Sequence, residues 1–137
     1  MWLCLKYEAL AMLNRGNGAI VNCASWLARG ALVGSSVYSA TKAAVDGLMR
    51  GAALEWADQG IRVNNVAPGG VDTEMTRQAL GTPEAVTSFG QTHPVQRIGK
   101  PEEVANLVTW LCSDEASFIT GESILIDGGY TIPGQRN

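Results

Sequence analysis

The fold is decided by residues 19–67, which read AIVNCA (19–24), SWLARGALVGS (25–35), SVYSATKAAVDGLMRGAALEWAD (36–58), QG (59–60) and IRVNNVA (61–67). The first and last segments are nearly continuous apolar runs, which are typical of strands buried on both faces of a sheet. Residues 36–58 carry apolar side chains at helical spacing, and Gly60 stands where a C-terminal cap is expected. A strand, a helix and a second strand predict parallel pairing, because parallel neighbours need a long crossover.

Further elements are expected on both sides of this unit. Residues 2–14 are predicted to form a helix, with Leu3, Tyr7, Leu10 and Leu13 on one face. Residues 72–92 should form short helices and loop, a helix should begin at Pro101, and residues 122–126 should form a third strand. The predicted fold class is α/β, with three strands and three main helices. Doubly wound sheets usually have about six strands, so the pattern corresponds to the C-terminal half of a Rossmann-type parallel sheet.

The composition bears on three questions: nucleic-acid binding, membrane insertion and contact with other subunits. The 137 residues are 46% hydrophobic and 17% charged, with a net charge of −3. This charge gives no reason to expect nucleic-acid binding, and no apolar run approaches the ~18 residues of a membrane span. The charged fraction is below the usual ~25%, which indicates that another subunit or a missing part of the fold covers some of the surface.

The cysteines and the single histidine suggest no special chemistry. Cys4, Cys23 and Cys112 form no Cys-x-x-Cys pair and are predicted to be reduced, mostly buried thiols of a cytoplasmic protein. Lys6 places charge too early for the apolar core of a secretory signal. His93 is predicted to be a loop residue, and the ligands are too sparse for a metal site.

Tyr38 and Lys42 lie in the opening turns of the predicted helix 36–58. Residues four apart share a helix face, about 5–6 Å apart at Cβ. A phenol is almost fully protonated at neutral pH, but an ammonium about 5 Å away favours the phenolate by about 3 kcal/mol at an effective dielectric constant of about 20. The pair therefore indicates general acid–base chemistry, and the alternative is an ordinary solvated helix face.

Two further segments are expected at the same edge of the sheet. Ser25 directly follows the first strand, and ligands of open α/β folds bind where parallel strands end. Its hydroxyl can donate to a carbonyl oxygen, or Ser25 can simply cap a turn. Residues 68–73, Pro-Gly-Gly-Val-Asp-Thr, follow the second strand, and their backbone suits an amide or a phosphate. The alternative is a turn in which Asp72 or Thr73 caps the next helix.

Taken together, these segments resemble the short-chain dehydrogenase/reductase family, in order and over essentially the whole chain. The matching segments are residues 18–25 (GAIVNCAS), 38–42 (YSATK), 61–69 (IRVNNVAPG), 97–105 (RIGKPEEVA) and 126–129 (IDGG). The resemblance implies an oxidoreductase that uses NAD or NADP to interconvert an alcohol and a carbonyl compound.

The resemblance also implies a role for each candidate site residue. Tyr38 would exchange the hydroxyl proton, Ser25 would hold the substrate oxygen, and Lys42 would favour the phenolate and bond to the nicotinamide ribose. The turn at Pro68 and Gly69 would lie under the nicotinamide, and Val71 and Thr73 would contact its carboxamide or a nearby phosphate. Family members commonly pair through the long helix, so a homo-oligomer is expected.

The N-terminal half of the family has no counterpart in these residues. No Gly-x-x-x-Gly-x-Gly turn follows a first strand, and Gly16-Asn17-Gly18 precedes a strand, so this segment cannot bind a pyrophosphate. Two hypotheses follow. Residues 1–137 are the catalytic part of an NAD(P)-binding Rossmann-like domain, or they form a non-catalytic truncated chain that folds or assembles only with a longer homologue.

Overall fold

A computed structural model of the protein describes residues 1–132, and all structural statements below refer to them. The elements, in chain order, are α1 (Trp2–Leu13), β1 (Gly18–Cys23), η1 (Trp26–Ala28), α2 (Ser36–Trp56), η2 (Ala57–Gln59), β2 (Ile61–Pro68), α3 (Glu74–Leu80), α4 (Pro83–Gln91), α5 (Pro101–Cys112), η3 (Asp114–Ala116) and β3 (Ser123–Ile126). Each predicted strand and long helix is present to within about two residues. Gly60 ends the α2–η2 segment with a left-handed φ of 77°, as its position predicts.

The three strands form one parallel sheet in the order β1-β2-β3. Gly18 of β1 lies opposite Ile61 of β2, and Asn65 of β2 lies opposite Ser123 of β3. This arrangement confirms the predicted α/β fold with a Rossmann-like parallel sheet. Because β1 pairs only with β2 among residues 1–132, it is an edge strand of the described sheet.

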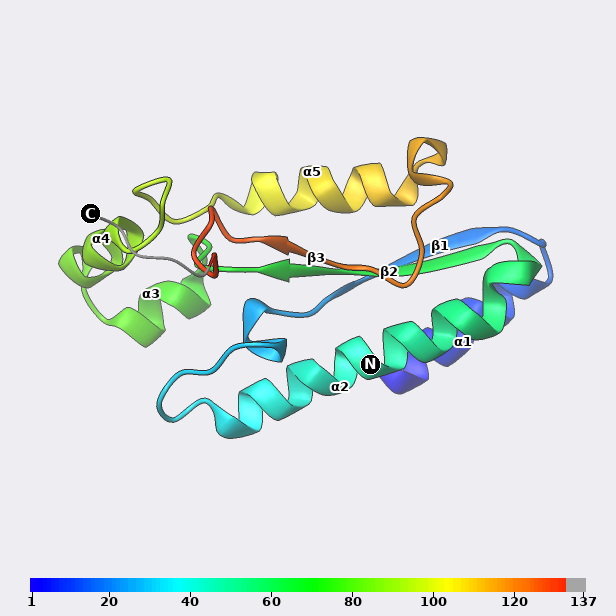
Figure 1. The fold of residues 1–137 in the computed structure, drawn as a ribbon, viewed down its shortest axis with the longest axis horizontal. Coiled ribbons are helices and arrows are strands. Elements are labelled where there is room, and N and C mark those ends of the chain that lie inside the picture. Colours follow the sequence, from blue (N-terminus) through cyan, green and yellow to red (C-terminus); the bar gives the residue numbers. More distant parts are fainter. Residues whose placement is uncertain (133–137) are drawn as a thin grey trace.

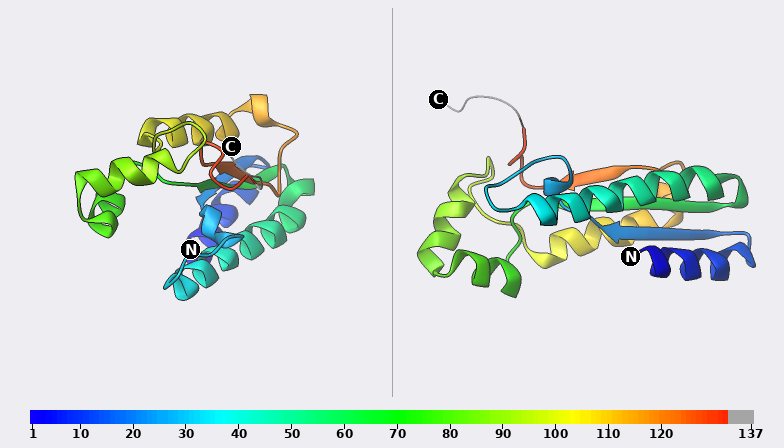
Figure 2. Two further views of the ribbon diagram at one scale, coloured as in Figure 1. Left: turned by 60° about the vertical axis from the view of Figure 1, so that its left-hand side comes forward. Right: turned by 90° about the horizontal axis from the view of Figure 1, so that it is seen from below.

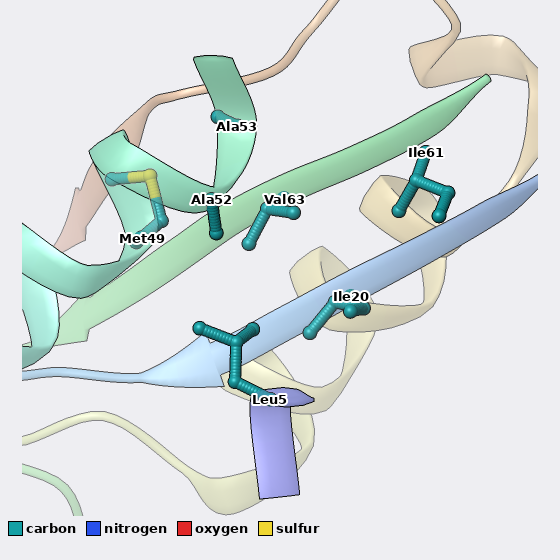
Figure 3. Packing of buried hydrophobic residues seen from close by; sticks show 7 residues of the cluster. All are labelled: Leu5, Ile20, Met49, Ala52, Ala53, Ile61 and Val63. Carbon is teal, nitrogen blue, oxygen red and sulfur yellow. The ribbon is translucent and has the colours of Figure 1, made fainter. Parts of the chain in front are cut away.

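Helices cover both faces of the sheet. Helix α5 lies on one face, whereas α1 and α2 lie on the other (Figures 1 and 2). The core on the side of α1 and α2 contains the buried residues Leu5, Ile20, Met49, Ala52, Ala53, Ile61 and Val63 (Figure 3). A second cluster beneath α5 is built around Val66, Leu111 and Ala116. Within residues 1–132, no helix has both the length and the apolar character needed to cross a bilayer.

The buried face of α1 differs from the predicted one. Leu5 and Ala9 are buried, whereas Leu3, Tyr7 and Leu10 are 58%, 63% and 49% exposed. Helix α1 carries apolar residues around most of its circumference, so periodicity alone does not determine which side packs. Contact with β1 through the cluster that contains Leu5 and Ile20 decides it.

The prediction that the cysteines are mostly buried is wrong. Cys4, Cys23 and Cys112 are all free and all exposed. Cys4 lies on the outer side of α1, Cys112 is the last residue of α5, and Cys23 ends β1 at the open edge of the sheet. Each position escapes burial because it lies at an element end or faces away from the sheet.

Candidate active site

A cleft of about 360 Å³ opens where β1 and β2 end, and every predicted site residue lines it. Its walls are formed by Cys23, Ala24, Ser25, Tyr38, Lys42, Pro68, Gly69, Val71, Thr73, Met75, Thr76, Pro101 and Val104. The strands point toward the side of the molecule on which α3 and α4 lie (Figure 1). This position agrees with the general rule that ligands of open parallel sheets bind beyond the carboxyl ends of the strands.

Tyr38 and Lys42 face the cleft from the start of α2. Tyr38 is 40% exposed, and the Lys42 Nζ atom lies 5.6 Å from the centroid of its ring. The same Nζ donates a hydrogen bond of 2.9 Å to the carbonyl oxygen of Cys23, at the end of β1. This bond ties the ammonium to the sheet, so that Lys42 keeps its place beside Tyr38.

Ser25 both caps a turn and lines the cleft. Its side chain is buried, and its Oγ accepts a hydrogen bond of 3.2 Å from the Leu27 N–H at the start of η1. Ser25 therefore does cap a turn, as the alternative predicted. In this contact the hydroxyl oxygen only accepts, so the hydroxyl proton is not used. Because no described residue accepts the hydroxyl proton of Ser25, the proton can be donated to an oxygen atom in the cleft.

The segment after β2 brings backbone groups into the cleft. Gly69 N–H donates to the Ile126 carbonyl at 3.1 Å, and a Cβ on Gly69 would lie 2.6 Å from the Cβ of Asp127. Only glycine fits between these two turns. Val71 forms an isolated parallel bridge with Gly99, and its N–H has no acceptor within residues 1–132. A free amide donor at this position suits a carbonyl oxygen or a phosphate.

Thr73 plays the capping role that the sequence left open. Its Oγ1 accepts a hydrogen bond of 3.3 Å from the Thr76 N–H and so caps α3. Asp72 instead pairs with Arg77 at 2.8 Å, and the hydrogen bond from this guanidinium holds the pKa of the Asp72 carboxyl below its usual range. Thr73 still lines the cleft, so capping and ligand contact are compatible.

An ion pair fixes the helix that closes the far wall of the cleft. Arg97 contacts Glu103 through two hydrogen bonds of 2.7 Å, and the Lys100 N–H donates to the same carboxylate. The bonds from Arg97, followed by that from Lys100, lower the pKa of Glu103 from 4.5 to about 2. These contacts hold the first turn of α5, from which Pro101 and Val104 reach the cleft.

Sequence reasoning missed several features near the cleft. Cys23 lines it directly, and only the tertiary structure reveals this, because a strand-end thiol has no distinguishing sequence signal. His93 is a loop residue as predicted, but it is 1% exposed and stacks on Tyr130, with its Nε2 unpartnered among the described residues. No sequence signal predicts this burial in a polar segment.

Known proteins resemble this chain in sequence. Residues 1–131 match the family described as enoyl-(acyl carrier protein) reductase. The chain is similar to cyclohexanol dehydrogenase from Acinetobacter sp. (strain SE19), with 45% identity over 127 residues, covering 93% of this chain and 49% of the relative. It is equally similar to cis-4-hydroxycyclohexanecarboxylate dehydrogenase from Sinomonas cyclohexanicum, with 45% identity over 130 residues, covering 94% and 51%.

Solved structures are similar to this chain in both fold and sequence. ElxO with NADP bound has a TM-score of 0.86 and 39% identity, over 94% of this chain and 52% of that one. The Thermoplasma acidophilum aldohexose dehydrogenase, in ligand-free form, has a TM-score of 0.90 and 37% identity, over 96% and 55%. The chain therefore spans about half the length of the relatives that it matches.

Proposed function

Because the chain belongs to the short-chain dehydrogenase/reductase family of oxidoreductases, we propose that it carries the catalytic residues of an enzyme that interconverts an alcohol and a carbonyl compound with NAD or NADP. The observation that carries the proposal is that one cleft contains Ser25, Tyr38 and Lys42 together with the turn that follows β2. These groups come from three separate segments of the chain.

The cleft offers groups that fit a nicotinamide cofactor. The Val71 N–H has no protein acceptor among the described residues and suits a carboxamide oxygen. Pro68 and Gly69 line one wall, and Lys42 and Thr73 offer donors for a ribose hydroxyl or a phosphate. When bound, such a cofactor would accept or supply a hydride at the carbon that carries the reacting oxygen.

The side chains of the cleft would handle the proton and the substrate oxygen. Tyr38 would accept the hydroxyl proton as the alcohol is oxidised and return it in the reverse direction. The Lys42 ammonium, held by the Cys23 carbonyl, would keep a positive charge beside Tyr38 while this proton moves. Ser25 would donate its free hydroxyl proton to the substrate oxygen and hold that oxygen beside Tyr38.

The substrate is proposed to be a small secondary alcohol or the corresponding ketone. Similar proteins are named for cyclohexanol and for cis-4-hydroxycyclohexanecarboxylate. Met75 and Val104 give the cleft apolar wall surface, which would suit the hydrocarbon part of such a ring. Cyclohexanol is therefore the first substrate to test.

The test is turnover of the protein expressed from its complete reading frame, followed at 340 nm with cyclohexanol and either NAD or NADP. Tyr38→Phe removes the proton-exchanging hydroxyl and should lower kcat by about 10²–10⁴-fold. Tyr7→Phe is the matched control, because Tyr7 is 63% exposed on α1, outside the cleft. An unchanged rate for Tyr38→Phe would refute the role of this tyrosine.

The alternative is a non-catalytic chain that assembles with a longer homologue. It predicts that the 137-residue chain binds no NADH in a fluorescence titration and co-purifies with the homologue. Saturable NADH binding, abolished by Lys42→Met, would count against it. The dehydrogenase names of the relatives do not favour this alternative.

We also propose a homo-oligomer formed through α2 and a cytoplasmic location. A groove between α1 and α2 is lined by Trp2, Gly47, Gly51 and Trp56 among others, and Leu54 on α2 is 85% exposed. A second copy that packs there would cover this apolar surface. Sedimentation of the wild type and of Leu54→Glu should distinguish an oligomer from a monomer. The free cysteines suit a reducing compartment.

A further inference from the structure

A row of three polar side chains crosses the sheet at one level. Asn22 of β1 lies opposite Asn65 of β2, which lies opposite Ser123 of β3. All three residues are buried, with exposed fractions of 8%, 0% and 7%. Asn22 Nδ2 donates to Asn65 Oδ1 at 3.0 Å. Because buried donors are unfavourable without acceptors, the amide of Asn65 and the hydroxyl of Ser123 need an acceptor from outside the sheet.

Asp46 of helix α2 supplies this acceptor. Its Oδ1 accepts hydrogen bonds from Asn65 Nδ2 at 2.8 Å and from Ser123 Oγ at 2.9 Å, and its side chain is only 5% exposed. Asp46 follows Lys42 by one helical turn and Tyr38 by two, on the same side of α2. One carboxylate therefore fixes the helix that carries Tyr38 and Lys42 to β2 and β3, and through Asn65 to β1.

The second oxygen of Asp46 faces the segment that begins at Ser25. Its Oδ2 lies 3.5 Å from the Nε of Arg29, the residue that ends η1 four positions after Ser25. Within residues 1–132, Asp46 forms no other ion pair. A buried carboxylate that loses its only counter-charge is strongly unfavourable. The pair therefore holds Arg29, and with it the η1 turn, against α2.

The connection along the chain does not fix the distance between Ser25 and Tyr38. Residues 31–34 lie between η1 and α2, and all are exposed. The η1 turn itself is tied to Ser25, because the Leu27 N–H donates to the Ser25 Oγ. A contact that joins the end of η1 to α2 therefore bears directly on where the Ser25 hydroxyl lies relative to the phenol.

We propose that Arg29 and Asp46 are positioning residues that hold Ser25 in place opposite Tyr38. Neither residue lines the cleft, so each acts through the segment that it anchors. The inference rests on the proposed function, because it concerns the same cleft. The proposal adds that two residues outside the cleft connect the segment of Ser25 to the helix of Tyr38.

The test uses Arg29→Gln, Asp46→Asn and Arg29→Lys in the protein expressed from its complete reading frame. In Asp46→Asn, the amide oxygen can still accept from Asn65 and Ser123, so the contacts between α2 and the sheet are kept. Arg29→Lys keeps the positive charge. Arg50→Gln is the matched control, because Arg50 is exposed on the same helix.

Arg29→Gln and Asp46→Asn should each lower kcat about tenfold and raise KM for the alcohol, since a misplacement of about 1 Å can lower a rate by up to ~100-fold. KM for NAD or NADP should not change, because both substitutions leave the bonds between α2, which carries Lys42, and the sheet in place. The other residues proposed to contact the cofactor lie at or after the end of β2. The double variant should be no slower than Asp46→Asn alone, because both changes break one contact. Arg29→Lys should recover most of the rate, and Arg50→Gln should match the wild type.

Amide hydrogen exchange gives a readout that needs no turnover. Residues 26–35 should exchange faster in Arg29→Gln and Asp46→Asn, but not in Arg50→Gln. Unchanged exchange in this segment, or faster exchange with an unchanged kcat, would overturn the positioning role and leave the proposed function intact. A general rise of both KM values would also overturn it. A wild-type protein that turns over no alcohol would overturn the proposed function, and the positioning role with it.

Discussion

Replacing Gly69 with alanine should lower the free energy of unfolding by about 1–3 kcal/mol, the usual effect of overpacking. Gly69 directly follows the last residue of β2 and lines the cleft. A Cβ on this residue would lie 2.6 Å from the Cβ and 2.8 Å from the Cα of Asp127. Carbon atoms in ordinary contact are about 3.5–4.0 Å apart. The turns after β2 and β3 would therefore have to separate by about 1 Å, which also strains the hydrogen bond from Gly69 N–H to Ile126.

Urea denaturation of the protein expressed from its complete reading frame measures this change in free energy. Thermal denaturation should show a fall in Tm of about 2–4 °C for each kcal/mol lost. Gly99→Ala is the matched control, because a Cβ on Gly99 would meet only atoms at ordinary contact distance, the nearest being the Gly70 carbonyl oxygen at 3.5 Å. This variant should stay within about 0.5 kcal/mol of the wild type. A loss of stability in Gly69→Ala alone would support the steric argument. A Gly69→Ala variant within about 0.5 kcal/mol of the wild type would refute it.

Three further predictions concern the core, the Arg97–Glu103 ion pair and the cysteines. Met49→Ala should lower the free energy of unfolding by about 2–5 kcal/mol, because Met49 is fully buried. Met75→Ala, at a 71% exposed position on α3, should change it by less than about 0.5 kcal/mol. Glu103→Gln should be less stable than the wild type above pH 4.5, where the carboxylate with its lowered pKa contributes fully. This difference should shrink to zero as the pH falls toward about 2. Denaturation between pH 2 and 7 measures it, and a constant difference would contradict the assignment of Glu103. A thiol reagent should modify Cys4, Cys23 and Cys112 in the native protein, and NADH should slow only the reaction of Cys23, the cysteine that lines the cleft. Equal protection of Cys112 would contradict the placement of the cofactor.

Local sequence patterns predicted most of the fold. Residues 19–24 and 61–67 were identifiable as strands because buried parallel strands are apolar on both faces. The boundaries shifted by one or two residues, as for β1, which begins at Gly18 and ends at Cys23. The packing of α1 was predicted incorrectly, because its apolar side chains are distributed around the helix and only contact with β1 selects Leu5 and Ala9.

The candidate site was predicted where its members depend on spacing along one element or on the end of a strand. Tyr38 and Lys42 share a helix face at four-residue spacing. Ser25 directly follows the first predicted strand, residues 19–24. The remaining features depend on neighbours far apart in the chain. Cys23 lines the cleft because β1 ends beside α2, and the Lys42 bond to its carbonyl joins residues 19 positions apart.

The amino-acid sequence by itself determined the order and type of the elements, the parallel pairing and the placement of the site residues at one sheet edge, because these follow from backbone periodicity. Only the tertiary structure decided that Asp46 accepts bonds from two strands and faces Arg29. The same holds for the burial of His93 and the exposure of the thiols. Burial and side-chain pairing depend on what the opposite element presents, and a periodic pattern carries no information about that partner.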